Sequence, residues 1–275
     1  MPLFFPGDPS HLRAMDDAEL LERADLNLME FNRESARSTA GGIVHEEGGL
    51  LFFVPGHRFP VGFSGVIRMD RCLPASEAVA RAREYFKALK VGYTHIVMMH
   101  RDDDVADALG AAGIGQVGNS PGMALDAPLS GPALPRDVTL ERVAGPAAAR
   151  DFAEVTGAAY ATYGMPARIA VKQFADHRYF DLPHVAAYLA RVGGKASAAA
   201  MVMVTHGVAG IYWVGTTPEA RGKGLAELCT RTAGNTGFEM GARKVVLQAS
   251  VMGEPIYRRM GYREITRYPW FTAIP

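Results

Sequence analysis

The stretch Arg221-Gly222-Lys223-Gly224-Leu225-Ala226 decides the fold of this 275-residue chain. It follows an apolar run at 211–214 that is typical of a strand, and it opens a segment with helical spacing. The first N–H groups of a helix have no intrahelical acceptor and carry partial positive charge, and glycine lets an anion approach them without a Cβ in the way. The stretch therefore predicts an anion site suited to a diphosphate.

The spacing of this stretch excludes two other phosphate-binding motifs. A G-x-x-x-x-G-K-[ST] loop needs a hydroxyl where Gly224 stands, and G-x-G-x-x-G needs a third glycine where Glu227 stands. What fits is R-x-x-G-x-A, preceded by Pro218-Glu219-Ala220. This pattern resembles the acyl-CoA-binding signature of the GNAT superfamily of N-acyltransferases. The alternative for this pattern alone is a surface turn that holds a glycine and a basic residue.

A second segment strengthens the resemblance. Tyr257-Arg258-Arg259-Met260-Gly261-Tyr262 is similar to the family's L-Y-x-x-x-G-F segment, and Gly261 stands where a helix C-terminus favours a left-handed residue. Tyr257 follows Arg221 by 36 residues, which leaves room for the helix and strand that the fold requires. The resemblance implies that Tyr257 is the general acid that protonates the departing coenzyme A thiolate. The alternative is that its ring only packs between a helix and the sheet.

The order of predicted elements also resembles the GNAT fold over about residues 137–275. Strands are expected at 138–140, 184–192, 196–204, 208–214, 244–249 and within 262–272. A helix is expected from Leu225, closed by Gly237 and Gly241, and a shorter one holds Tyr257. The predicted fold class is α/β (α+β) with a mixed, mostly antiparallel sheet.

The first part of the chain repeats nearly the same succession. Helices are expected at 16–37, 74–90 and 104–112, and strands at 49–54, 62–69, 93–99 and 122–125. A connector with proline and glycine, Leu129 to Arg136, separates the two parts. The sequence thus predicts two GNAT-like domains in tandem, at residues 1–130 and 136–275.

The N-terminal domain is predicted to be degenerate. Where the other half has its glycines, it has Leu73 to Ala80, in which Ser76 and Glu77 are ordinary helix-start residues and Glu77 would repel an anion. Leu109 stands four residues before Gly113, where the other half has Tyr257, and leucine has no proton to donate. We expect one coenzyme site for each chain; the missing glycines disfavour a second.

The resemblance implies direct transfer of an acetyl group from acetyl-CoA, as co-substrate, to a primary amine of a small molecule in a ternary complex. It implies that the backbone N–H groups of Val214 and Thr216 hold the pantetheine arm and polarise the thioester carbonyl. The amides of 222–226 would take the diphosphate, and Arg221 or Lys223 would add charge or remain a solvated turn cation. The predicted coenzyme-binding residues are Val214, Gly215, Thr216, Arg221, Gly222, Lys223, Gly224, Leu225 and Ala226.

The sequence points to no general base. Between His206 and Pro218 there is no Asp or Glu, and Tyr212, near the expected place, is a poor base and is better explained as a packed strand aromatic. His184, His206 and Asp181 are candidates by chemistry only. The missing base also keeps open a function of another class, a non-catalytic acyl-CoA-binding sensor or scaffold. The intact pairing of phosphate turn and Tyr257 favours the enzyme.

Other polar and aromatic groups receive less specific interpretations. Asp102-Asp103-Asp104 lies before a predicted helix and is interpreted as a helix start rather than a metal cluster, so no metal is expected. Two short basic patches, at 57–58 and 177–179, could contact an anionic acceptor. Residues 158–181 are predicted to wall the acceptor site with the side chains of Tyr160, Tyr163, Met165, Tyr179 and Phe180.

Composition agrees with a cytoplasmic enzyme. Lys plus Arg and Asp plus Glu are 29 each, which disfavours a nucleic-acid partner. Cys72 and Cys229 lie far apart, and Cys229 falls on the apolar side of a predicted helix, so a disulfide is not expected. No apolar run has the length of a membrane span, and the first residues lack the features of a signal peptide. The oligomeric state is not readable from the sequence.

Overall fold

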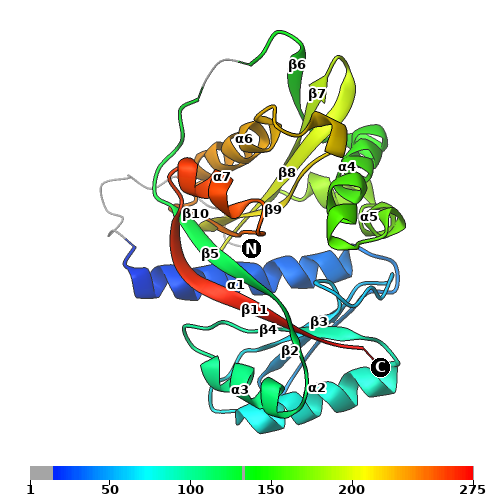
Figure 1. Cartoon of the computed structure of the whole chain (residues 1–275), viewed down its shortest axis with the longest axis vertical. Coiled ribbons are helices and arrows are strands. Elements are labelled where there is room, and N and C mark those ends of the chain that lie inside the picture. Colours follow the sequence, from blue (N-terminus) through cyan, green and yellow to red (C-terminus); the bar gives the residue numbers. More distant parts are fainter. Residues whose placement is uncertain (1–14, 132–133, 275) are drawn as a thin grey trace.

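A computed structural model describes residues 15–131 and 134–274 (Figure 1). Its helices are α1 (Asp17–Arg37), α2 (Ala75–Leu89), α3 (Asp103–Ala111), α4 (Gly145–Tyr160), α5 (Ala167–Gln173), α6 (Leu225–Glu239) and α7 (Glu254–Arg259). Its strands are β1 (Ile43–Glu47), β2 (Leu50–Val54), β3 (Gly65–Arg68), β4 (Tyr93–Ile96), β5 (Gln116–Leu125), β6 (Val138–Arg142), β7 (Val185–Val192), β8 (Lys195–Thr205), β9 (Val208–Thr216), β10 (Lys244–Gln248) and β11 (Arg263–Ala273). Within the described residues, short 3-10 helices lie at Ala161–Tyr163, His177–Asp181 and Pro218–Ala220.

All these strands form one sheet in the order β1-β2-β3-β4-β11-β5-β10-β9-β8-β7-β6. Two neighbouring pairs, β3 with β4 and β9 with β10, are parallel, and every other neighbouring pair is antiparallel. Each parallel pair is joined through a helix, α2 in the first case and α6 in the second. The predicted mixed, mostly antiparallel sheet is confirmed, and so is the repetition of one succession of elements.

The two repeats exchange their last strands. β5, which ends the first repeat, lies between β10 and β11, and β11, which ends the second, lies between β4 and β5. Figure 1 shows these two long strands crossing the molecule side by side. Each repeat therefore completes its sheet with a strand from the other, and strand pairing crosses the connector at 129–136.

The helices cover both faces of this sheet. One buried cluster joins α1, α4 and α5 to residues such as Leu189, Met201 and Met203, while another joins α6 and α7 to Ala190, Val202 and similar residues. Neighbouring residues of one strand, such as Leu189 and Ala190, belong to different clusters because successive side chains of a strand point to opposite faces. The core therefore consists of two layers with the sheet between them.

The structure departs from the predicted elements at two strands of the first repeat. β1 was not predicted, because its last two residues are exposed and no apolar alternation marks it. β5 begins at Gln116 rather than at the predicted residue 122. Its first five residues were not predicted as strand because they are half-buried or exposed and lack an apolar run.

The predicted end of α6 at Gly237 was also wrong. α6 continues to Glu239, and Gly237 lies inside it, where an added Cβ would be 2.4 Å from the Cβ of Ala209. This glycine therefore serves close packing of the helix on β9 rather than helix termination. Gly241 does follow the helix end, with a positive φ of 93°.

Candidate functional site

The site begins where β9 separates from β10. Their last paired residues are Ile211 and Leu247, but β9 continues to Thr216. The Thr217 N–H donates to Ser197 O on β8 at 2.9 Å. Because N–H groups alternate between the two edges of a strand, those of Val214 and Thr216 face the opposite edge, beyond the paired part of β10.

A β-bulge increases this separation. Ala199 pairs with Gly215 and Met201 with Tyr212, so Trp213 and Val214 together stand opposite one residue of β8. Trp213 has a positive φ of 55°, which is uncommon for a residue with a Cβ. A bulge of this kind bends the strand and redirects its backbone groups.

The turn after β9 supplies the second wall. Gly222 and Gly224 have φ angles of 77° and 72°, in the left-handed region that favours glycine, and a Cβ at either position would meet no atom within 4 Å. The first backbone bond of α6 runs from the Leu228 N–H to Gly224 O. The amides before Leu228 thus have no acceptor within the helix and border open space, which fits a diphosphate.

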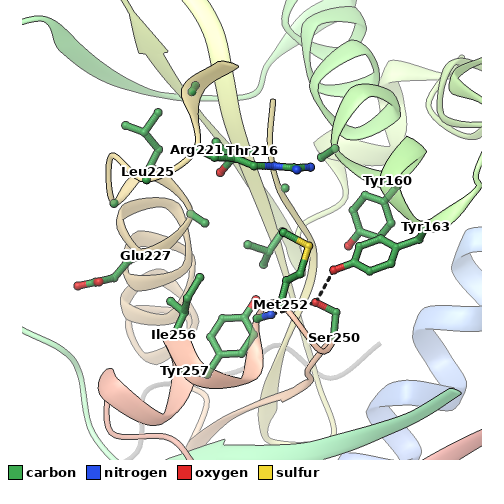
Figure 2. A pocket seen from close by; sticks show the side chains of 18 of the residues that line it. Tyr160, Tyr163, Thr216, Arg221, Leu225, Glu227, Ser250, Met252, Ile256 and Tyr257 are labelled. Atoms are coloured by element: carbon green, nitrogen blue, oxygen red, sulfur yellow. Dashed lines mark hydrogen bonds between the residues drawn. The ribbon is translucent and has the colours of Figure 1, made fainter. Parts of the chain in front are cut away.

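These elements enclose a cavity of about 360 Å³ (Figure 2). The predicted residues that line it are Val214, Gly215, Thr216, Arg221, Gly222, Gly224, Leu225, Ala226 and Tyr257. Of the predicted coenzyme-binding residues, Lys223 alone is not among the lining residues; its side chain is exposed on the turn. Residues from two separated motifs of the sequence therefore meet around one space.

Tyr257 forms the wall opposite the phosphate turn. It lies on α7 with 7% of its surface exposed, and its ring centroid is 5.7 Å from that of Tyr262. Gly253 makes room for the Tyr257 ring, since a Cβ there would approach it to 2.8 Å. Burial raises the pKa of the Tyr257 phenol above its ordinary range, so this group remains a neutral proton donor at physiological pH.

Further residues line the cavity that were not assigned to the site from the sequence motifs, among them Tyr160, Tyr163, Ser250 and Met252. Tyr160 and Tyr163 do fall within the predicted aromatic wall, and the Tyr163 hydroxyl donates to Ser250 Oγ at 3.0 Å. Ser250 belongs to neither of the two sequence motifs. No local pattern distinguishes it, because its place on the cavity wall depends on a tertiary contact with Tyr163.

The rest of the predicted aromatic wall does not line this cavity. Met165, Tyr179 and Phe180 are buried in the cluster that joins α4 and α5 to the sheet. Their apolar side chains pack with Phe152 of α4 and with Phe174 rather than toward the cavity. The predicted acceptor wall is therefore reduced to Tyr160 and Tyr163.

Charges at the cavity are arranged around its rim. Arg221 donates from Nη2 to Thr162 Oγ1 at 2.7 Å, which holds the guanidinium beside the turn. Arg259 also lines the cavity from α7. Among the lining residues Glu227 is the one carboxylate, 3.5 Å from Arg231 Nη1, and it points away from the tyrosines in Figure 2.

The candidates considered for a general base lie elsewhere. Tyr212 is buried, stacks on Phe31 with centroids 3.7 Å apart and donates to Asn27 Oδ1 at 2.6 Å. Burial raises the pKa of Tyr212, as expected for a packed strand aromatic. His206 occupies the β8–β9 turn, and neither it nor His184 or Asp181 lines the cavity.

In the first repeat, an ion cluster stands at the corresponding place. Arg68, at the end of β3, donates from Nη2 to Asp102 Oδ1 at 2.8 Å and to Asp104 Oδ1 at 2.6 Å, and from Nη1 to Leu73 O at 3.0 Å. Arg68 and Asp102 are buried. β3, α2 and α3 match β9, α6 and α7 in order, so this cluster corresponds in topology to the place of the cavity in the second repeat.

Asp102 stands at the predicted helix start but does not cap the helix with its side chain. It is the residue before α3, and its carboxylate binds Arg68 instead. Asp102 binds Arg68 rather than the N-terminus of α3 because a buried guanidinium needs a carboxylate close by. Within residues 15–131 and 134–274, no group of three or more His, Cys, Asp or Glu side chains could hold a metal ion.

The two basic patches and the two cysteines lie outside the cavity. His57 Nε2 lies 3.0 Å from Gln173 Oε1, Arg178 pairs with Asp176, and neither patch lines the cavity. Cys72 is exposed and Cys229 is buried on α6, and both are free thiols. None of the helices in the described ranges is long and apolar enough to cross a membrane.

Comparison with known proteins relates this architecture to solved structures. No family model and no curated protein sequence matches the chain. A GCN5-related N-acetyltransferase from Kribbella flavida superposes with a TM-score of 0.70 at 22% identity, over 92% of this chain and 96% of that one. One from Sphaerobacter thermophilus gives 0.58 at 18%, over 95% and 94%.

A tandem GNAT protein from the clavulanic acid biosynthesis pathway gives a TM-score of 0.60 at 16% identity, over 95% of this chain and 96% of that one. These similarities extend over nearly the whole chain, through both repeats and the exchanged strands. The chain therefore has the fold of the GNAT N-acetyltransferases in a tandem arrangement.

Proposed function

We propose that this protein is a cytoplasmic N-acetyltransferase that transfers the acetyl group of acetyl-CoA directly to a primary amine of a small molecule. One observation carries the proposal. The phosphate turn before α6, the free edge of β9 and Tyr257 of α7 surround a single cavity, although they come from separate segments of the sequence. A coenzyme A thioester needs this combination: a cradle for its diphosphate, donors along its arm and a proton for its sulfur.

The backbone at 214–216 holds and activates the thioester in this proposal. The N–H groups of Val214 and Thr216 face the cavity edge of β9 and are held in place by the pairing of β9 with β8. Donors that are already in position stabilise the developing oxyanion without reorganisation when the amine attacks. Amides 222–226 and Arg221 hold the diphosphate, which places both reactants side by side.

Tyr257 completes the transfer. As the tetrahedral intermediate collapses, the carbon–sulfur bond breaks and the Tyr257 hydroxyl gives its proton to the departing sulfur. Because burial keeps this phenol protonated, the donor is present over the whole neutral pH range. The first repeat takes no part in coenzyme binding in this proposal, because Arg68 and its carboxylate partners stand at the corresponding place.

Calorimetric titration with acetyl-CoA tests the proposal without knowledge of the acceptor. We expect one site for each chain, and Gly224→Val should weaken binding by about tenfold or more, because its side chain enters the phosphate cradle. Gly193→Val is the matched control: Gly193 also has a positive φ and open surroundings, but it lies in the β7–β8 turn away from the cavity.

A panel of amines then tests catalysis by the release of free thiol from acetyl-CoA. Binding of acetyl-CoA at two sites would contradict the proposal that the first repeat takes no part in coenzyme binding. Folded protein that does not bind acetyl-CoA would overturn the proposed function as a whole. Binding without turnover of any amine would support the sensor in place of the enzyme.

A further inference from the structure

Two hydroxyl groups form a hydrogen-bonded pair on the cavity wall. Tyr163, at the end of the 3-10 helix that follows α4, donates from Oη to Ser250 Oγ at 3.0 Å (Figure 2). Ser250 follows β10, so the pair joins two elements that approach each other only in the folded chain. Both side chains line the cavity that holds Tyr257.

The backbone of the following turn holds the Ser250 hydroxyl in place. The Gly253 N–H donates to Ser250 Oγ at 3.1 Å, and the Glu254 N–H donates to Ser250 O at 2.9 Å. The oxygen is thus fixed at the start of α7, while its proton is free to rotate. A hydroxyl both accepts and donates, so the bond to Tyr163 can run in either direction.

The two ends of the pair lie in different surroundings. Ile211 and Leu247 are the last paired residues of β9 and β10, so Val214 and Ser250 each stand three residues beyond this pair, and both line the cavity. Val214 is the residue whose N–H faces the proposed thioester. At the other end, Tyr163 is 49% exposed and reaches solvent. The pair therefore connects the reacting centre with bulk water.

We propose, on the basis of the proposed function, that Ser250 and Tyr163 form the route by which the attacking amine loses its proton. The ammonium proton passes to Ser250 Oγ, the Ser250 proton passes to Tyr163 Oη, and the Tyr163 proton passes to water. The nitrogen lone pair that this frees attacks the thioester carbon. Each oxygen gains one proton and gives up another, so neither side chain holds a charge at the end.

The other groups around the pair are placed for different tasks. The titratable and charged groups that face the cavity from the surrounding elements are Tyr160 of α4, Arg221 of the turn, Glu227 of α6, and Tyr257 and Arg259 of α7. Burial raises the pKa of Tyr160 and Tyr257, so both remain protonated donors, and Glu227 is directed to Arg231.

A pair of nearly isosteric acceptors tests this route. 2-Phenylethylamine is protonated near pH 7, like other alkyl amines with a pKa of about 10, whereas O-benzylhydroxylamine has oxygen in place of one methylene and is neutral at that pH. Both carry a ring that suits a cavity walled by tyrosines. We would measure kcat/KM from pH 6 to 10 for the unchanged protein, Ser250→Ala and Tyr163→Phe.

For 2-phenylethylamine, each substitution should lower kcat/KM about 100-fold near pH 7, and the loss should nearly disappear toward pH 10, where about half of the amine is already deprotonated. For O-benzylhydroxylamine, the loss should be small at every pH. The double variant should lose no more than either single variant, because both changes interrupt the same route.

Tyr188→Phe is the matched control. The Tyr188 hydroxyl also bonds to a second hydroxyl, Thr236 Oγ1 at 2.8 Å, but neither residue lines the cavity. Equal losses with both acceptors, losses that persist at pH 10, or no loss at all would overturn the route. Acetyl-CoA binding separates these results from failure of the proposed function: each variant should bind the coenzyme like the unchanged protein.

Discussion

At the scale of single residues, the chemistry of the site depends on which side chains can donate a proton. Tyr257 is buried and neutral, and its neighbour Tyr160 is another phenol whose pKa burial raises. Removing the charged form of a phenol from water is costly, so both groups keep their protons far above neutral pH. This makes them donors rather than bases, in agreement with a mechanism that needs a proton at sulfur.

Tyr257→Phe should separate catalysis from binding. The ring stays and packs against Tyr262, but the proton for the leaving sulfur is lost, so kcat should fall about 100-fold with little change in the dissociation constant of acetyl-CoA. Single-turnover rates and calorimetry measure the two quantities. Tyr188→Phe again serves as the control, and a Tyr257→Phe variant with unchanged kcat would show that another group provides the proton.

At the scale of elements, the two repeats differ at corresponding places: the second has a cavity and the first has an ion cluster. In the second repeat the bulge at 213–214 and the glycine turn open a space between strand and helix. In the first repeat Arg68 binds Asp102 and Asp104 at the corresponding place. We expect a buried guanidinium with two carboxylates to exclude a diphosphate both by its volume and by the charge of the carboxylates.

Arg68→Met should destabilise the protein rather than open a second site. It removes the guanidinium that bonds to the buried carboxylate of Asp102 and leaves only Arg101 Nε, 3.5 Å from Asp102 Oδ2, which costs about 3 kcal/mol of unfolding free energy. Arg81→Met, which breaks an exposed pair with Glu77 on α2, should cost less than about 1 kcal/mol. Denaturant unfolding of both variants measures this difference. Gain of a second acetyl-CoA site in Arg68→Met would contradict the proposed role of the cluster.

The same cluster predicts a dependence of stability on pH. The hydrogen bond from Arg68 lowers the pKa of Asp104 below its ordinary value of about 4, so the stabilising pair is complete above that pH and is lost as the pH falls through the lowered pKa. The difference in Tm between the unchanged protein and Asp104→Asn should therefore be largest near pH 7 and shrink below pH 4. A difference that stays constant from pH 7 to pH 3 would contradict this assignment.

At the scale of the whole molecule, the exchanged strands join the two repeats. β11 pairs with β4 and β5, and β5 pairs with β10 and β11, so each repeat lacks a central strand without the other. α1 adds contacts across the same junction: Asn27 donates to Met203 O at 3.1 Å and accepts from Tyr212. The coenzyme cavity belongs to the second repeat, but its sheet depends on the first.

Separate expression of residues 136–275 tests this dependence. Without β5, β10 loses one neighbour and β11 loses both of its neighbours, so we expect no cooperative thermal unfolding and no acetyl-CoA binding. Mixing with residues 1–130 should restore both properties, because the missing strands are then supplied in trans. Circular dichroism and calorimetry follow the two properties. A fragment 136–275 that folds and binds by itself would show that the exchange is not required.

The sequence by itself determined those features of this protein that depend on a few neighbouring residues. The alternation of apolar residues predicted most strands, and the glycines at 222 and 224 and the segment at 257–262 predicted where an anion and a proton donor belong. These signals are local, since each depends on backbone conformation or on the residue type at one position. Tertiary structure alone decided the exchange of β5 and β11, the binding of Asp102 to Arg68 and the approach of Tyr163 to Ser250. Each of these joins residues far apart in the chain, and the free energy of such contacts depends on burial and geometry that no local pattern records.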